Sequence, residues 1–212
     1  PRQPLRTAPH VLFALNADRR DGLDSTAFLQ SIPVPLTVSG TSSGTVDEDG
    51  VLEGIANNGP GDGIAGGVGD VAGTATVATG SVTGLFQSGA DEALSYSLAT
   101  NTSGLPALTS GGVAVTYAVV GNTLTAEAGA GNTVFTFALD GTTGVWTFTL
   151  VDQLDHPTLN GLAGDNEEND LTINLGSLIQ ATDYDGDTVT ASGSAVQVVV
   201  DDDTPIALSG TS

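Results

Sequence analysis

Cysteine, methionine and lysine are absent from this chain of 212 residues, and all four basic residues are arginines within the first twenty positions. Without cysteine there is no disulfide, no thiol nucleophile and no Cys-ligated zinc or iron. From Asp21 onward the chain carries 24 of its 25 carboxylates and no Lys or Arg, and its formal net charge is −21. A lysine Schiff base is therefore excluded. Because nucleic acids and anionic membrane surfaces need a basic patch on their partner, we expect neither as a binding partner.

Long apolar runs are also missing. None approaches the roughly 18 residues of a membrane-spanning helix, and no signal peptide is visible. The chain begins at Pro1 rather than Met, which predicts a mature product or an excised piece. Aromatic residues make up only 5%, whereas 29 glycines accompany abundant Ser and Thr, and 39% of residues are hydrophobic. This composition predicts a folded all-β protein with many turns.

A short segment recurs within the chain. The segments PLTVSGTS (35–42) and PIALSGTS (205–212) begin 170 residues apart. Repetition at a fixed distance indicates an array of similar modules. We therefore predict one full repeat over residues 35–204 and the start of the next at 205–212. Residues 1–34 form an N-terminal segment of uncertain structure, which is a linker, part of a neighbouring module or a strand donated to another chain.

Apolar and polar side chains alternate in several short segments of the repeat, separated by Gly, Asn and Asp. Strands with one buried and one solvated face are typical of an antiparallel β-sandwich. Gly121-Asn122 predicts a two-residue hairpin, and Asp140 to Gly144 predict another turn. We expect strands at 94–98, 113–119, 124–126, 135–139, 146–150, 171–175 and 196–200. The expected centre of the core is Trp146 with Phe135, Phe137 and Phe148.

The motif Asp183-Tyr-Asp185-Gly-Asp187 places three carboxylates at alternate positions around a glycine. Calcium binds six to eight oxygens at about 2.3–2.6 Å, and a tight turn lets such residues converge on one ion. Two carboxylates about 4 Å apart repel by roughly 4 kcal/mol at an effective dielectric constant near 20, so the cluster is costly without a cation. The motif predicts that Asp183, Asp185 and Asp187 bind calcium. The alternative is a solvated turn whose Asp side chains accept hydrogen bonds from backbone amides.

Other acidic clusters flank the repeat. Asp201-Asp202-Asp203 follows the last predicted strand, and Asp47-Glu48-Asp49 lies near the start, where it could occupy the equivalent junction on the other side. A cation that bridges two modules would make their hinge rigid, whereas the alternative is a linker kept soluble by its charge. The candidate cation ligands in these clusters are Asp47, Asp49, Asp201, Asp202 and Asp203. A third run at 165–170 is more typical of a polar loop.

Three features suggest other chemistry. The glycine-rich segment 54–73 predicts a long surface loop, and Gly66 to Asp70 within it is one degenerate copy of the nonapeptide of calcium-binding β-rolls. His156, between Asp155 and a proline, could be a general base, but no nucleophile motif accompanies it and we favour a turn histidine. Carboxylates for glycoside hydrolysis are plentiful, although aromatic residues that could form a sugar platform are few. We therefore predict that the protein is not an enzyme.

Several motifs occur together in a recognisable order. They are Val46–Gly50, Gly66–Asp70 through Ala78–Gly80, Val134–Asp140, Gly144–Leu150, Leu154–Pro157, Ala181–Asp187 and Val198–Pro205. Their combination resembles the long tandem repeat of giant bacterial repeats-in-toxin (RTX) adhesins, which are exported by type I secretion. The resemblance covers about residues 46–205 and does not include 1–34. It implies an immunoglobulin-like β-sandwich, extracellular calcium at module junctions, and a role in bacterial surface attachment and biofilm. By this match, the implied calcium ligands are Asp183, Asp185, Asp187 and Asp201 to Asp203.

These observations together predict a non-enzymatic extender module on the bacterial cell surface, whose partners are adjacent like repeats and whose cofactor is calcium. A chain secreted unfolded benefits from having no disulfides and a high negative charge, which external calcium then neutralises as the chain folds. Two alternatives stay open. One is a ligand-binding domain, for instance for a glycan, with its site in 54–73 or 1–34. The other is a fibre subunit in which a strand such as 10–15 completes a neighbour's sheet.

Overall fold

The computed structural model describes five ranges of the chain, namely 37–51, 74–88, 93–156, 170–184 and 186–202. Several sequence predictions lie outside these residues. They concern the N-terminal segment 1–34, the glycine-rich segment 54–73, Asp185, Asp203 and the start of the next repeat at 205–212.

The described residues form strands and short 3₁₀ turns, without an α-helix. One sheet has six strands in the order β3–β10–β9–β8–β7–β6. Their bounds are β3 (Val77–Ser81), β6 (Thr109–Ser110), β7 (Val113–Val120), β8 (Thr123–Ala128), β9 (Thr133–Leu139) and β10 (Val145–Leu150). Within this part of the chain no helix is both long and apolar enough to cross a membrane.

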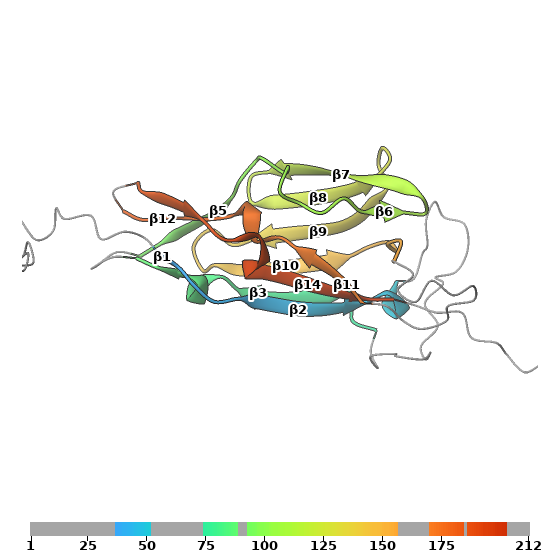
Figure 1. The fold of residues 1–212 in the computed structure, drawn as a ribbon, viewed down its shortest axis with the longest axis horizontal. Coiled ribbons are helices and arrows are strands. Elements are labelled where there is room, and N and C mark those ends of the chain that lie inside the picture. The colour runs from blue at the N-terminus through green and yellow to red at the C-terminus, as the bar shows by residue number, and fades with distance from the viewer. Residues whose placement is uncertain (1–36, 52–73, 89–92, 157–169, 185, 203–212) are drawn as a thin grey trace, which may run out of the picture.

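Two three-stranded sheets and one short ladder complete the fold. The sheets have the orders β11–β14–β2 and β13–β12–β5, and β1 pairs with β4. The bounds are β1 (Thr37–Val38), β2 (Ser42–Asp47), β4 (Phe86–Gln87), β5 (Ser95–Leu98), β11 (Leu171–Asn174), β12 (Ile179–Thr182), β13 (Thr188–Thr190) and β14 (Val196–Asp201). The strands run along the long axis of the molecule and enclose one core (Figure 1). The predicted all-β sandwich is confirmed.

The core has the aromatic centre that the alternating pattern predicts. Trp146, Phe135, Phe137 and Phe148 are all fully buried. The rings of Phe135 and Phe148 stack with centroids 4.9 Å apart, and those of Phe137 and Trp146 stack at 5.7 Å. The Trp146 indole N–H donates to Ser42 Oγ at 2.9 Å, which ties β10 of the six-stranded sheet to β2 of the opposite layer. The aromatic cluster therefore joins the two layers.

Both predicted turns are present. β7 and β8 pair up to Val120 and Thr123, and Gly121 between them has a positive φ of 59°, as a two-residue hairpin requires. Between β9 and β10, Asp140 Oδ1 accepts the backbone N–H groups of Thr142 and Thr143 at 2.9 and 2.8 Å. These local hydrogen bonds hold the hairpin turn, and the carbonyls of Gly141 and Gly144 also accept the N–H groups of Tyr96 and Val82.

One strand pair departs from the antiparallel pattern. β2 runs parallel to β14, whereas the other pairings of described strands are antiparallel. Parallel strands end at the same edge of a sheet, so Asp47 and Asp201 become register partners. The ends of β2 and β14 lie at one end of the long axis, and β1 begins at the other (Figure 1). This topology gathers acidic residues from distant parts of the sequence.

Candidate metal centre

The candidate site lies where β2 and β14 end. After β2 the chain turns into the short 3₁₀ helix η1 (Glu48–Gly50), and Asp47 Oδ1 accepts the backbone N–H of Asp49 at 2.8 Å. Asp47, Asp49 and Asp201 are only 6%, 8% and 2% exposed. Charged carboxylates are almost never this buried unless they are paired or coordinate a metal. The end of the sandwich therefore concentrates negative charge in a shielded place.

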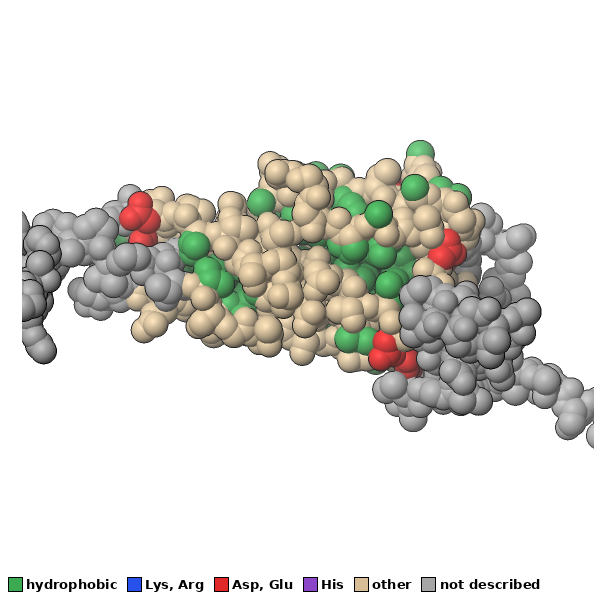
Figure 2. Space-filling model, in the orientation of Figure 1, with side chains coloured by type: hydrophobic (Ala, Val, Ile, Leu, Met, Phe, Trp, Pro, Cys, Tyr) green, Lys and Arg blue, Asp and Glu red, His purple; other side chains and the backbone are tan. Residues whose placement is uncertain are grey.

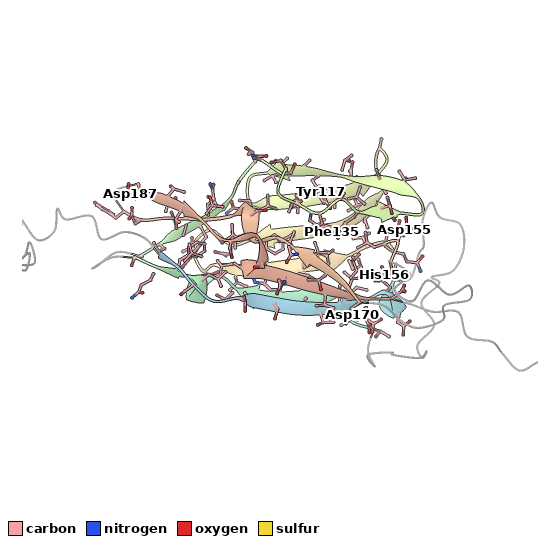
Figure 3. The ribbon with its side chains drawn as sticks, in the orientation of Figure 1. Tyr117, Phe135, Asp155, His156, Asp170 and Asp187 are labelled. Atoms are coloured by element: carbon pink, nitrogen blue, oxygen red, sulfur yellow. The ribbon has the colours of Figure 1, made fainter. Side chains whose placement is uncertain are left out.

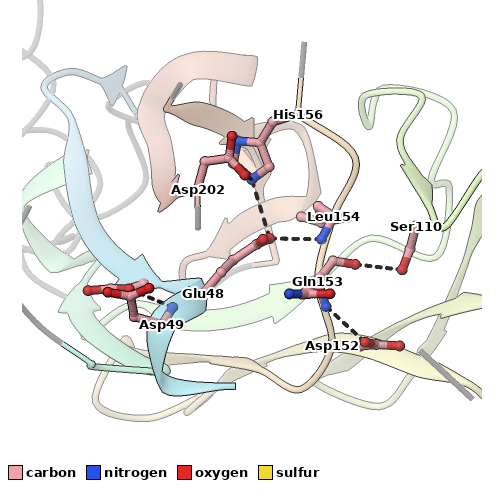
Figure 4. Close-up of polar contacts among 9 residues, drawn as sticks. Glu48, Asp49, Ser110, Asp152, Gln153, Leu154, His156 and Asp202 are labelled. Carbon is pink, nitrogen blue, oxygen red and sulfur yellow. Dashed lines mark hydrogen bonds and ion pairs between the residues drawn. The ribbon is translucent and has the colours of Figure 1, made fainter. Parts of the chain in front are cut away.

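Glu48 lies at the centre of a second group in the same place. It is 1% exposed, and its Oε1 accepts the backbone N–H of Leu154 at 2.8 Å (Figure 4). The same oxygen lies 3.3 Å from His156 Nε2, which in turn lies 4.0 Å from Asp202 Oδ1. One donor atom from each of these three side chains lies within 4.8 Å of the others. We call Glu48, His156 and Asp202 the mixed-donor cluster.

The segment after β10 holds His156 in position. The Ser110 hydroxyl donates to the Gln153 carbonyl, and Asp155 N donates to the Thr109 carbonyl at 2.9 Å. Asp155 Oδ2 accepts the Gly112 N–H at 2.8 Å. These bonds fasten the segment to β6 and to the turn that follows it, so the imidazole projects toward Glu48 with its side chain 4% exposed.

The site contains many carboxylates and very few groups that can carry a positive charge. His156 is the one side chain among the described residues that can become a cation, because the four arginines all precede residue 37. Burial raises the pKa of Glu48, and the contact with His156 opposes this shift only in part. Burial also raises the pKa of Asp152, which is 7% exposed, against a hydrogen bond from the Gln153 N–H. Carboxylate oxygens and an imidazole nitrogen in this arrangement can bind a divalent cation or share a proton.

The structure brings together four of the residues that the sequence singled out as candidate ligands. Asp47, Asp49, Asp201 and Asp202 share one end of the sandwich. The suggestion that Asp47-Glu48-Asp49 occupies the opposite junction from Asp201 is wrong, because the parallel pairing of β2 and β14 puts both clusters at the same end.

The motif from Asp183 to Asp187 lies at the other end of the long axis, far from His156 (Figure 3). Asp183 Oδ1 accepts the N–H groups of Gly186 and Asp187 at 3.2 and 2.9 Å. Gly186 has a φ of 98°, a left-handed conformation that glycine adopts without strain. Asp183 thus forms the backbone-capped acidic turn of the alternative interpretation, and calcium binding by Asp183, Asp185 and Asp187 stays a prediction. The third acidic run lies outside the described residues except for Asp170.

Sequence reasoning missed two residues of the mixed-donor cluster. It read His156 as a turn histidine and did not count Glu48 among the candidate ligands. His156 does lie in an irregular segment, but its side chain is buried against Glu48. The available signal was that His156 is the one histidine in a region that contains many carboxylates and neither Lys nor Arg.

Comparison with known proteins gives one match. Residues 45–194, more than two thirds of the chain, match the family model described as a domain of unknown function, DUF5801. The matched range contains Glu48 and His156 and stops before Asp201 and Asp202. No curated protein and no solved structure matches the chain. The chain therefore belongs to the DUF5801 family.

Proposed function

We propose that this protein is a calcium-stabilised extender module of a secreted bacterial surface adhesin, which supports attachment and biofilm formation. The observation that carries the proposal is the placement of the two acidic clusters. The described chain begins with β1 at one end of the long axis, beside the Asp187 turn, and leaves at the other end through Asp202 (Figures 1 and 3). Modules of this shape extend a rod when they are joined end to end.

In such an array, the end of one module that carries Asp201 and Asp202 faces the end of the next that carries Asp183 and Asp187. Acidic side chains lie at both ends of the face seen in Figure 2, whereas the middle of that face shows uncharged and hydrophobic side chains. Like charges across a junction repel the modules, whereas a divalent cation between them attracts both. Calcium would thus convert a flexible junction into a stiff one.

The donor set fits calcium. Asp47, Asp49 and Asp201 supply carboxylate oxygens, which calcium prefers, in a buried place where the described residues offer no Lys or Arg. The calcium ion would offset the repulsion among these carboxylates and thereby stabilise the folded module. The two alternative functions depend on segments 1–34 and 54–73, which lie outside the described residues, so no observation favours either of them.

Thermal melts test the calcium part of the proposal. At a free concentration of 100 times its Kd, one calcium site adds about 2.7 kcal/mol. For a domain of this size that corresponds to a rise in Tm of about 5–10 °C over the same protein in chelator. We expect much of this rise to disappear when Asp47, Asp49 and Asp201 are all replaced by asparagine, and to persist in the control Glu127→Gln on β8. An unchanged Tm in calcium contradicts the proposal.

Small-angle scattering of two repeats in tandem tests the extender part. We expect the maximum dimension to be close to twice that of one repeat in calcium, with a narrow distribution of shapes. In chelator the distribution should broaden because the junction bends. Identical curves in the two buffers contradict a calcium-stiffened junction even if each module is stabilised.

A further inference from the structure

We infer that Glu48, His156 and Asp202 form a binding site for a first-row divalent transition metal such as zinc, separate in chemistry from any calcium site. The inference does not depend on the proposed extender function. It rests on the identity of the three donors, on their spacing and on the way the fold holds them.

The donor types select the metal. Calcium and magnesium take oxygen ligands almost without exception, whereas an imidazole nitrogen together with carboxylate oxygens suits zinc and its neighbours. His156 contributes Nε2, and Glu48 and Asp202 contribute one oxygen each. Two carboxylates and a neutral imidazole carry a charge of −2, which a divalent cation balances. A protonated His156 alone would leave one negative charge uncompensated.

The spacing fits a small ion. Bonds of about 2.1 Å from zinc to nitrogen and oxygen place tetrahedral ligands about 3.4 Å from one another. The distance from Glu48 Oε1 to His156 Nε2 is 3.3 Å, which matches this value. Asp202 Oδ1 is 4.0 Å from the same nitrogen and its side chain is 20% exposed, so its oxygen would have to approach by about 0.6 Å when an ion binds. Three protein ligands leave a fourth position for water.

The surroundings hold the ligands as a metal site requires. A ligating carboxylate is usually fixed by an outer hydrogen bond, and here the Leu154 N–H binds Glu48 Oε1 at 2.8 Å. Its other contact is with His156 Nε2, and an ion bound between the two atoms would replace that hydrogen bond. Glu48 is anchored by the η1 turn, and His156 by the bonds of its segment to Thr109 and Gly112. The two least exposed ligands are therefore positioned before any ion arrives.

The chain offers a matched control, because its one other histidine, His10, is not part of the mixed-donor cluster. The experiment uses the full chain, freed of metal by a chelator and then titrated with zinc alone. Isothermal titration calorimetry should give one strong site. Since loss of an outer-shell partner already weakens metal binding about 10–100-fold, His156→Gln should weaken zinc binding at least tenfold. His10→Gln should bind zinc like the unaltered chain.

Proton NMR of the unaltered chain gives a readout that needs no variant at the site. One of the two sets of histidine ring signals should shift at one equivalent of zinc, and that set should remain in the His10→Gln spectrum. The inference is overturned if the His156 signals do not move, if His10→Gln abolishes zinc binding, or if equimolar calcium displaces the zinc. The calcium-dependent melts are a separate measurement. If zinc does not bind, the proposed extender function is unaffected, and if calcium does not raise the Tm, the zinc site is unaffected.

Discussion

Asp47 and Asp201 are register partners at the last position of the parallel β2–β14 pair, and both are nearly buried. Adjacent strands lie about 4.8 Å apart, so the two carboxylates start from neighbouring backbone positions. The burial shields them from water, which strengthens their repulsion. We therefore expect the stability of the folded chain to depend on cations at this end of the sandwich.

The first prediction concerns this pair. Asp201→Asn removes one negative charge with little change in shape, so in chelator it should raise the free energy of unfolding by on the order of 1 kcal/mol. In calcium the same variant should gain less stability than the unaltered chain, because a ligand is lost. Urea unfolding in the two buffers measures both effects. Glu127→Gln on β8 is the control and should change stability by less than about 0.5 kcal/mol. A variant that loses stability in chelator argues against charge repulsion at this site.

The second prediction concerns the packing of Trp146. Gly80 on β3 is its register partner, and a Cβ at this glycine would overlap the indole ring. Trp146 is fully buried and cannot move aside without disturbing Phe137. Gly80→Ala should therefore destabilise the protein by about 1–3 kcal/mol. Gly84→Ala is the matched control, since a Cβ there meets no atom within 4 Å. Equal urea midpoints for the two variants would show that the indole pocket is loosely packed.

The third prediction concerns pH and the turn at Asp140. Hydrogen bonds from the backbone N–H groups of Thr143 and Thr142 lower the pKa of Asp140 below its ordinary value. Because the folded pKa is the lower one, the stabilisation is fully present above the unfolded pKa, near 3.8, and is lost as the pH falls through the folded value. Asp140→Ala should thus lower the Tm at pH 7, and the difference should shrink below about pH 4. Melts at pH 7, 5 and 3 measure it. A difference that stays constant with pH means that the charge of Asp140 is not involved.

Local patterns predicted most of the longer strands, but not β2 or β3, which have six and five residues. Alternation at Phe135–Leu139 and Trp146–Leu150 gave β9 and β10 almost residue for residue, because one face of each strand is buried. The two-residue strands β1, β4 and β6 are too short to show any period. The parallel pairing of β2 with β14 could not be predicted from local patterns either, because it joins segments more than 150 residues apart and is set by tertiary packing.

In the candidate site too, local features could be predicted from the sequence, whereas contacts between distant segments could not. Runs of acidic residues at 47–49 and 201–203 are visible in the sequence, and their charge alone predicts a cation. Glu48 and His156 are 108 residues apart, and only the fold brings them within 3.3 Å. Nothing in the sequence around Glu48 indicates that its side chain is buried. Nothing around His156, which precedes a proline, indicates that its imidazole is buried either. Both facts depend on where β2 ends relative to the segment after β10.

The parallel pair also determines how the module bears tension. Ser42–Asp47 and Val196–Asp201 run side by side along the long axis, six residues each. A pull on the two ends of an array draws β2 by its beginning and β14 by its end, in opposite directions. The hydrogen bonds between these strands are then loaded in shear and must rupture together, whereas a hairpin pulled from its open end unzips one pair at a time. In the proposed array, the first and last long strands of the described chain would thus form a mechanical clamp.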